Sequence, residues 1–507
     1  MAKGDMPILV GAGQFTSRWA GDDGPAGAPS PLSLAHAACE AAIADCGAPR
    51  VGASIDTLAV VRIFEDSIPG GGHPHGHNTN LPGTLARELR VQPRRLIYSS
   101  VGGQSPQALV NEFAALIHEG GADCVLIAGS EANGASKAAR RKGISLDWED
   151  GAEAAVEDRG LGDMLLSRHE IKHGLVSPPY FYGLFENAIA AREGRTRSAH
   201  RAAMSDLFAR FSAVAADNPL SQFPERREAG WLAAPSAENY ELADPFLKWH
   251  VAQDAVNQGS AVVLMSQSKA DALGVPGGKR VYLHGAGEAG DDFLSVRPRL
   301  DGSAAMEVAL GRALEAAERS VDEIALFDLY SCFPCAVFSA CGALGLDPFR
   351  DPRPLTVTGG LPFFGGPGNT YSLNAIATMA DRLRAAPGAY GLVLANGGWM
   401  TKEAAGVYST DKPARFAPAA PPQAPGPSLD IDPAPTRGVI KTFTVIHGRS
   451  GPERGLALCE TPAGGRFLAA ADGPALAILR REESPVGRLV TVSHSGEVNT
   501  FGFGDTL

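Results

Sequence analysis

A pair of cysteines is the first place where residue types and spacing could support chemistry. Cys332 and Cys335 form a Cys-x-x-Cys pattern, which is typical of metal binding or disulfide exchange. The sequence has no second pair at metal-ligand spacing, and a helix is expected to begin here. We therefore interpret both side chains as buried structural thiols.

Histidines gather in a second segment, the glycine-rich loop at 69–80. Residues 72–77 read Gly-His-Pro-His-Gly-His, a pattern that could hold a metal weakly. A solvated loop is the simpler interpretation, so we expect no metal site.

Two pairs of glycines are the third feature. Gly102-Gly103 and Gly365-Gly366 each precede a segment with a helical pattern. Free N–H groups and the helix dipole favour negative charge at the start of a helix. Each turn could therefore stabilise a developing oxyanion or the oxygen of a thioester.

The elements around the glycine pairs repeat. Residues 98–108 read YSSVGGQSPQA and lead through a helical segment to a strand that ends at Ser130. Residues 363–374 read FFGGPGNTYSLN and lead through a similar segment to a strand that ends at Gly398. Two units of matching length, about 265 residues apart, indicate duplicated halves of one fold.

Alternating strand and helix patterns extend through both halves and predict α/β layers. The expected N-terminal half covers 1–274 and contains a helical insertion at about 132–239. The expected C-terminal half covers 275–416. Within these halves we predict strands at 6–13, 57–64, 95–98, 280–285 and 323–330, and helices at 33–46, 180–192, 198–217 and 304–319.

The last part of the chain differs in composition. Residues 417–438 are rich in proline and alanine and predict a stiff linker. Beyond it, a small all-β domain is expected at 439–507. Its predicted strands are 439–447, 455–460, 467–471, 475–480 and 489–494.

Composition excludes several classes of partner. A net charge of −11 over 507 residues opposes binding to nucleic acid. No apolar run approaches the roughly 18 residues of a membrane span, and no signal peptide is evident, so a cytoplasmic protein without a membrane partner is expected. The seven cysteines, odd in number and irregularly spaced, suggest reduced thiols.

Over about residues 6–412 these motifs resemble the thiolase superfamily. The resemblance is strongest to the sterol-carrier-protein-type thiolases and to the acetyl-CoA acetyltransferase-like proteins with an additional C-terminal domain, called thiolase-like protein type 1. It implies a duplicated five-layered α/β fold with a helical loop domain, here containing Asn218-Pro219, and a small all-β C-terminal domain. Residues 257–267 look like the family's turn and strand before the second half, with Gln258 in place of the usual Asp.

The side chains of ordinary thiolase chemistry are absent at the matching positions. The nucleophilic cysteine would fall within Val101–Gly103, where no thiol stands. Tyr330-Ser331-Cys332-Phe333 replaces the Asn-Glu-Ala-Phe or His-Asp-Cys-Phe motif, Gly365-Gly366-Pro367 replaces Gly-His-Pro, and Ala395-Asn396-Gly397 replaces Cys-x-Gly. Thiolysis needs a thiolate, an imidazole and an acid or base, and none of these remains.

The resemblance nevertheless implies candidates. Tyr330 occupies the slot of the oxyanion-binding residue and is the preferred acid or hydrogen-bond donor, unless it only fills the vacated volume. Ser331 and Asn396 are weaker catalytic candidates. The residues expected to bind substrate or coenzyme A through their backbone are Gly102, Gly103, Gly365, Gly366, Gly397 and Gly398.

Two further side chains could contribute. Lys402 could contact a phosphate of coenzyme A, although such a lysine is more often solvated. If the histidine loop folds over the pocket, His73, His75 or His77 could replace the lost imidazole.

Three functions remain open at this point. The first is carbon–carbon bond cleavage or formation at a β-keto substrate, with direct attack by coenzyme A. The second is retro-aldol cleavage of a β-hydroxyacyl-CoA, and the third is non-catalytic binding of acyl-CoA. Coenzyme A is expected as a (co)substrate rather than a tightly bound cofactor, and the chain is expected to be a homodimer or a monomer.

Overall fold

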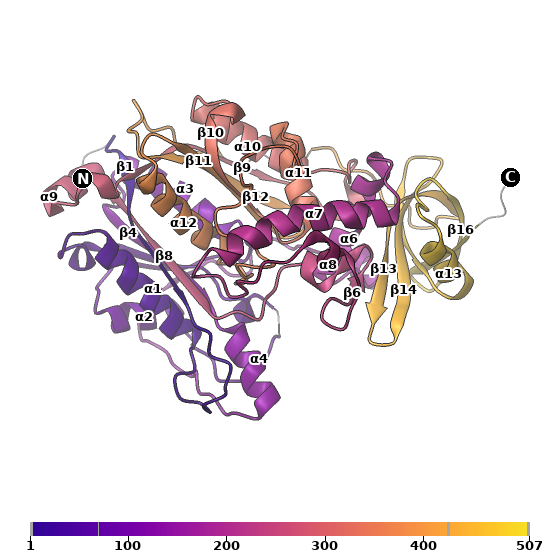
Figure 1. The fold of residues 1–507 in the computed structure, drawn as a ribbon, viewed down its shortest axis with the longest axis horizontal. Helices are drawn as coiled ribbons and strands as arrows, with labels where there is room; N and C mark the ends of the chain where they lie inside the picture. The colour runs from indigo at the N-terminus through magenta and orange to yellow at the C-terminus, as the bar shows by residue number, and fades with distance from the viewer. Residues whose placement is uncertain (1–3, 69, 423–425, 504–507) are drawn as a thin grey trace.

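The structure is a computed structural model that describes residues 4–68, 70–422 and 426–503. Pro69 of the histidine loop and residues 423–425 of the expected linker lie outside the described residues. Figure 1 shows a long molecule with the two halves of an α/β core at one end and a small β domain at the other.

The large sheet repeats one strand order in its two halves. In the first half, β1 (Pro7–Thr16) is followed across the sheet by β8 (Gln258–Ser266), β4 (Cys124–Glu131) and β2 (Thr57–Val60). In the second half, β9 (Val281–Gly290) is followed by β12 (Lys402–Ser409), β11 (Tyr390–Gly397) and β10 (Ile324–Leu329). β1 and β9 join the halves, and β3 (Arg95–Tyr98) and β5 (Glu157–Asp158) extend the first half beyond β2.

Helices fill three layers around these strands. α1 (Pro31–Asp45) and α2 (Leu81–Leu89) cover the outer face of the first half, and α10 (Ala304–Ala316) and α11 (Pro334–Leu344) cover that of the second. α3 (Ser105–His118) and α12 (Tyr371–Ala385) contact each other and strands of both halves (Figure 1). The predicted five-layered α/β fold is therefore confirmed.

The two halves also repeat their closest helix–strand contact. A Cβ on Gly13 of β1 would overlap the Ala38 carbonyl of α1, and a Cβ on Gly287 of β9 would overlap the Ala309 carbonyl of α10. Only glycine allows the backbones to approach this closely. A glycine at the same helix–strand contact in both halves supports the duplication that the glycine loops predicted.

The segment between the halves is mainly helical. Its two long helices, α6 (Pro178–Arg192) and α7 (Arg197–Ala216), correspond to the predicted ones. The shorter helices of this region are α4 (Asn133–Lys142), α5 (Arg168–Lys172), α8 (Ala229–Ala233) and, after β8, α9 (Gln267–Leu273). A buried ion pair between Glu186 Oε1 and His200 Nε2, 2.7 Å apart, joins α6 to α7.

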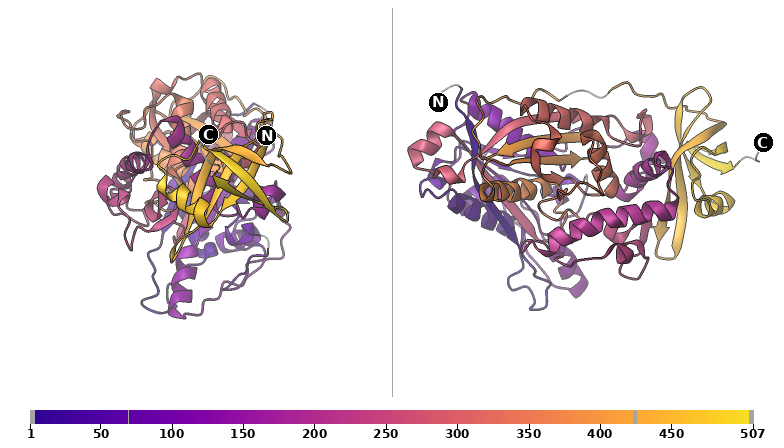
Figure 2. Two further views of the ribbon diagram at one scale, coloured as in Figure 1. Left: turned by 90° about the vertical axis from the view of Figure 1, so that its right-hand side faces the viewer. Right: turned by 45° about the horizontal axis from the view of Figure 1, so that its top comes forward.

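The C-terminal sheet includes strands from the middle of the chain. Its members are β13 (Arg437–Gly448), β14 (Gly451–Glu460), β15 (Arg466–Ala471), β16 (Leu489–Ser495) and β17 (Val498–Phe503), with β6 (Glu241–Ala243) and β7 (Phe246–Leu247) beside β13. Because β14 pairs with both β15 and β13, the sheet curls on itself, as the end-on view in Figure 2 shows.

The predicted strand at 475–480 is wrong. These residues belong to α13 (Gly473–Arg481), which has Pro474 in its first turn. The segment is apolar at five consecutive positions, 475–479, so strand and helix patterns both fit it. Helix formation buries Ala475 and Leu479, four residues apart, against the curled sheet.

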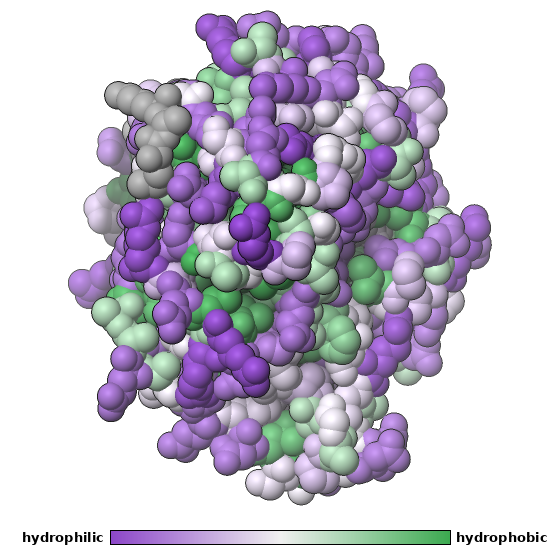
Figure 3. Space-filling model, turned by 90° about the vertical axis from the view of Figure 1, so that its left-hand side faces the viewer, coloured by the Kyte–Doolittle hydropathy of each residue, from purple (hydrophilic) through white to green (hydrophobic). Residues whose placement is uncertain are grey.

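Within the described ranges, no helix combines the length and apolar character of a membrane span. Figure 3 shows the end of the molecule away from the β domain, where apolar residues stand in small groups among polar ones. The described residues on this face form no broad apolar patch of the kind that marks a large interface.

Candidate functional site

The first glycine turn lies where the two central helices begin. The N–H of Gly102 donates to Asn369 Oδ1 at 3.2 Å, and Ser372 Oγ donates to the Gly103 carbonyl at 2.7 Å. Asn369 and Ser372 come from the start of α12, whereas the glycines precede α3. These bonds fix the two helix starts against each other across the middle layer.

The second glycine turn contacts a different segment. The N–H of Gly366 donates to the Gln253 carbonyl at 2.8 Å, and a Cβ on Gly365 would lie 2.5 Å from Gln258 Oε1. Gln258, which stands in the slot of the usual Asp, also donates from Nε2 to the Phe364 carbonyl at 3.0 Å. Asn369 and Ser372, rather than Gly365 and Gly366, therefore meet the first turn.

The end of β11 closes over the first turn. A Cβ on Gly103 would overlap both the Asn396 carbonyl oxygen and the Tyr330 hydroxyl. A Cβ on Gly102 or on Gly397 would overlap Gln104 Oε1. The structure thus brings these five predicted residues together. The Gln104 side chain lies between Gly102 of the first turn and Gly397 of β11.

Tyr182 connects the helical insertion to this cluster. Its hydroxyl donates to the Gly398 carbonyl at 3.1 Å and accepts from Asn396 Nδ2 at 3.0 Å. The Tyr182 ring stacks on Phe333 with centroids 4.2 Å apart. Asn396 Nδ2 also lies 3.7 Å from the Cys332 sulfur, within reach of a weak hydrogen bond. No sequence motif marked Tyr182, because it lies on a helix about 150 residues before Tyr330.

Tyr330 is buried beside this network. Its ring meets Tyr371 edge-on with centroids 5.5 Å apart, and burial raises the pKa of the Tyr330 phenol well above its usual value. Its hydroxyl oxygen would lie 2.4 Å from a Cβ on Gly103, so it faces the first glycine turn. A neutral phenol is a hydrogen-bond donor for a carbonyl oxygen.

Ser331 contacts the loop before the second glycine pair rather than the first glycine turn. Its hydroxyl accepts from the Leu361 N–H at 3.1 Å and packs against Gly360, in the loop before the second glycine pair. Neighbouring residues of an extended segment point in opposite directions, so Ser331 faces away from the side on which Tyr330 lies.

Both cysteines of the Cys-x-x-Cys pattern are buried and free of disulfides, as expected for structural thiols. Burial raises the pKa of Cys332 to about 12, and it raises that of Cys335 well above the usual range. Neither sulfur is a thiolate near neutral pH, so neither replaces the missing nucleophile.

Glu403 is the acid that sequence reasoning missed. It lies on β12 directly opposite Asn396 of β11 and is 2% exposed. Among the described residues, neither carboxylate oxygen has a hydrogen-bond partner. Burial raises the pKa of Glu403 well above 4.5, while the Arg297 guanidinium opposes the shift. Its only sequence signal is an acidic residue at the start of an apolar strand.

The surroundings of Glu403 are polar and incompletely paired. The carboxyl is close enough to raise the pKa values of Tyr330 and Cys332. Arg297 is also 2% exposed and donates from Nη2 to the Trp399 carbonyl at 3.0 Å. In this part of the molecule, several buried side-chain atoms have no hydrogen-bond partner among the described residues. They are Gln104 Oε1, Asn396 Oδ1, Arg297 Nη1, Trp399 Nε1 and both Glu403 oxygens. Such atoms need water or a bound molecule to satisfy them.

The remaining predicted positions lie at the edge of this cluster. Lys402 precedes Glu403 on β12, and burial lowers the pKa of its ammonium. Ser67, which lies just before the histidine loop, contacts the cluster through its hydroxyl, which accepts from Asn369 Nδ2 at 3.0 Å. His73 and His77 contact Asp66 rather than Tyr330 or Asn396.

Two cavities lie outside the cluster. One of about 320 Å³ is lined by residues of α7 and of the segment 352–356. Another, of about 130 Å³, lies beside the histidine loop. Neither is lined by Tyr330, Asn396 or Glu403.

Comparison with solved structures identifies the fold. A monomeric SCP2-thiolase-like protein type 1 from Mycobacterium smegmatis is 35% identical, with a TM-score of 0.83 over 99% of this chain and 100% of that one. An acetyl-CoA acetyltransferase from Syntrophomonas wolfei is 17% identical, with a TM-score of 0.57 over 81% of this chain and all of that one. An Ltp2-ChsH2(DUF35) aldolase is 18% identical, with a TM-score of 0.59 over 82% of this chain and all of that one.

No protein-family model and no curated protein sequence matches the chain. The two more distant structures share its fold. The mycobacterial protein matches nearly the whole length, including the C-terminal β domain, at 35% identity. The chain therefore belongs to the family of SCP2-thiolase-like proteins of type 1, which has the thiolase fold.

Proposed function

We propose that the chain acts on a coenzyme A thioester and makes or breaks the carbon–carbon bond of a β-keto substrate, without a covalent acyl-enzyme. The observation that carries this proposal is Glu403, a buried acid with two unpartnered oxygens opposite Asn396. Burial raises the pKa of the Glu403 carboxyl well above its usual value and so favours the protonated form, which can donate a proton.

In the cleavage direction, Tyr330 donates its O–H to the β-carbonyl oxygen and polarises it. The sulfur of free coenzyme A attacks that carbon, and the bond to the α-carbon breaks. The sulfur attacks as the thiolate, whose proton has gone to solvent. Glu403 then gives its proton to the α-carbon of the departing enolate and is reprotonated from solvent. The products are a shortened acyl-CoA and acetyl-CoA, so atoms and protons balance. Asn396 Oδ1 and Gln104 Oε1 are acceptors for the amide groups of the coenzyme's arm.

The test compares Glu403→Gln with Glu288→Gln, measuring consumption of free thiol with a panel of 3-ketoacyl-CoA substrates. Glu288 is a matched control. It is a largely buried acid on the adjacent strand, but it pairs with Ala404 rather than with Glu403. Its side chain therefore points to the opposite face of the sheet, where it accepts from Asn111 at 2.9 Å.

Loss of a general acid lowers turnover by roughly 10²- to 10⁴-fold. We expect this loss in Glu403→Gln and a rate near that of the unmodified chain in Glu288→Gln. Unchanged turnover in Glu403→Gln would contradict the assignment of Glu403. An acyl group found on any cysteine by intact-mass analysis would contradict the absence of an acyl-enzyme.

A second candidate function is non-catalytic binding of acyl-CoA. This function is favoured because protein groups already occupy the first glycine turn. The Gln104 side chain lies between Gly102 and Gly397, and the Gly102 N–H donates to Asn369. Calorimetric binding of acyl-CoA without turnover would support this function over catalysis. Release of an aldehyde or ketone from a β-hydroxyacyl-CoA, without uptake of thiol, would instead support retro-aldol cleavage.

A further inference from the structure

The histidine loop is held rigidly against a neighbouring segment. Gly76 has a φ of +92°, and a Cβ there would lie 2.6 Å from the Glu149 nitrogen, so the position requires glycine. The Trp148 N–H donates to the His75 carbonyl at 2.5 Å, and the His75 ring meets the Trp148 ring edge-on. The tight turn at Gly76 brings the residues on either side of it, His73 and His77, onto one side of the loop.

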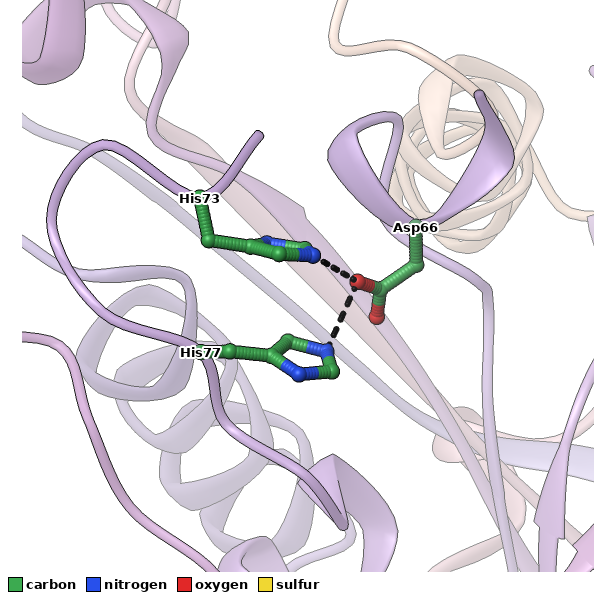
Figure 4. Close-up of side chains that lie close together, drawn as sticks. All are labelled: Asp66, His73 and His77. Atoms are coloured by element: carbon green, nitrogen blue, oxygen red, sulfur yellow. Dashed lines mark hydrogen bonds and ion pairs between the residues drawn. The ribbon is translucent and has the colours of Figure 1, made fainter. Parts of the chain in front are cut away.

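Three side chains converge at this loop. His77 Nε2 lies 3.1 Å from Asp66 Oδ1, and His73 Nε2 lies 3.6 Å from the same oxygen. The two imidazole rings are stacked with centroids 3.9 Å apart and an interplanar angle of 21°. Figure 4 shows both Nε2 atoms directed at the one carboxylate oxygen. All three potential ligand atoms lie within 4.8 Å of one another.

These separations match the ligand shell of a small divalent cation. A tetrahedral Zn²⁺ with bonds of about 2.0 to 2.1 Å places its ligand atoms roughly 3.3 to 3.4 Å apart. The two nitrogen–oxygen separations, 3.1 and 3.6 Å, lie on either side of this value. Hydrogen bonding to Asp66 accounts for His77 alone, because the His73 separation is too long for a hydrogen bond.

Neighbouring groups orient the three side chains. The Tyr98 hydroxyl donates to Asp66 Oδ2 at 2.6 Å, which leaves Oδ1 directed at the imidazoles. Glu65 Oε2 lies 3.8 Å from His73 Nδ1, the ring nitrogen that faces away from Asp66. The cavity of about 130 Å³ is lined by His73 and His77 and leaves room for water as a further ligand.

We propose that Asp66, His73 and His77 form a binding site for a divalent transition-metal cation, with Zn²⁺ as the preferred ion. Two imidazole nitrogens and one carboxylate oxygen suit this class of ion better than Mg²⁺ or Ca²⁺, which prefer oxygen ligands. The site does not depend on the proposed thioester chemistry. It is nevertheless connected to the first glycine turn through the Ser67, Asn369 and Gly102 hydrogen bonds, so a bound ion would fix Asp66 and Ser67 beside that turn.

The experiment measures Zn²⁺ binding by the untagged full-length chain after chelator treatment, using competition with a chromophoric zinc indicator. His73→Ala and His77→Ala each remove one ligand. Tyr98→Phe keeps all three ligands but removes the hydrogen bond that orients Asp66. His36→Ala is the matched control, because His36 also pairs with a carboxylate, Glu40 at 3.5 Å, but belongs to no three-ligand group among the described residues.

We expect one Zn²⁺ per chain, at least a tenfold loss of affinity in His73→Ala and His77→Ala, and unchanged affinity in His36→Ala. Tyr98→Phe is expected to lose about 10- to 100-fold, as is common for groups that orient a ligand. Absorption by Co²⁺ in the visible range is a second readout, which we expect in the full chain and not in the double variant His73→Ala/His77→Ala. No stoichiometric binding, or binding that survives in the double variant, would overturn the proposal.

Discussion

At the scale of single residues, the site depends on side chains that replace the usual thiolase groups with neutral ones. Tyr182, Tyr330 and Cys332 all have pKa values raised by burial. Glu403 joins them, since its pKa is raised well above 4.5. Burial therefore favours the uncharged forms of all four side chains, which lie near the buried cation Arg297.

The burial of Glu403 predicts a pH dependence of stability. Below 4.5 the carboxyl is protonated in both states. As the pH rises, the unfolded chain ionises while the folded chain does not, so the free energy of unfolding falls until the folded pKa is passed. Glu403→Gln removes this effect, and its stability relative to the unmodified chain should increase with pH in denaturant titrations.

Glu323→Gln is the control for this prediction. Hydrogen bonds from Ser320 lower the pKa of Glu323, so its contribution is present above 4.5 and is lost as the pH falls. Above 4.5 the difference in stability between Glu323→Gln and the unmodified chain should therefore stay constant. A constant difference for Glu403→Gln across the same range would mean that the carboxyl is not buried as described.

The close packing at Gly103 predicts a second residue-scale effect. In Gly103→Ala the new methyl group would overlap the Tyr330 hydroxyl and the Asn396 carbonyl, and overpacking of this kind costs about 1 to 3 kcal/mol. Adding Tyr330→Phe removes one of the two overlapping atoms and should recover part of the loss. Denaturant unfolding of the two single variants and the double variant measures this coupling. Strict additivity would show that the Tyr330 hydroxyl does not reach Gly103.

At the scale of elements, β5 protects the outer edge of the large sheet. It pairs with β3 through Ile97–Glu157 and Tyr98–Asp158, and Arg95 and Glu157 form an ion pair at 2.9 Å. An open strand edge is a template for pairing with a second chain. The related mycobacterial protein is monomeric.

This arrangement predicts a monomer whose β3 edge can be uncovered. Glu157→Pro removes a backbone donor from the strand that covers β3, so the variant should show a concentration-dependent dimer. Size-exclusion chromatography with light scattering distinguishes the two states. Glu153→Pro, in the preceding irregular segment, is the control and should remain monomeric. A stable dimer of the unmodified chain would contradict this view of β5.

At the scale of the whole molecule, the C-terminal β domain is integrated with the helical insertion. Asn187 on α6 donates to the Phe443 carbonyl of β13 at 2.9 Å and to the Asp244 carbonyl at 3.1 Å. Thr442 on β13 donates to the Leu184 carbonyl of α6. β6 and β7, from the middle of the chain, complete the same sheet. The domain is thus built from two distant parts of the sequence.

Removal of residues 437–507 should therefore destabilise the remaining chain rather than release an independent unit. The deletion would expose the α6 surface and the edge of β6, which now pack on or pair with β13. We expect a lower denaturation midpoint and increased binding of a hydrophobic dye. Asn187→Ala should also lower the midpoint. We expect it to reduce the free energy of unfolding by about 1 to 3 kcal/mol, because it leaves buried carbonyls unpaired. An unchanged midpoint after the deletion would show that the domain folds independently.

The sequence by itself determined the repeated architecture and several site positions. Alternating apolar segments and matching glycine loops predict two α/β halves because such signals are local and depend on the period of each element. The repeated loops point to Gly102 and Gly103, whereas Tyr330, Asn396 and Gly397 come from the resemblance to the thiolase motifs. Apolar patterns give the wrong prediction at 475–479, because five consecutive apolar residues fit both a strand and a helix.

Only the tertiary structure decided which of these residues meet. Strand order places Glu403 opposite Asn396. The packing of helices on the sheet brings Tyr182 and Gln104 into the same cluster from distant segments. It also turns His73 and His77 toward Asp66, in a loop whose sequence predicts only a solvated connection. The physical reason is that these contacts join residues without a shared local period, so their geometry exists only after the sheets and helices have packed.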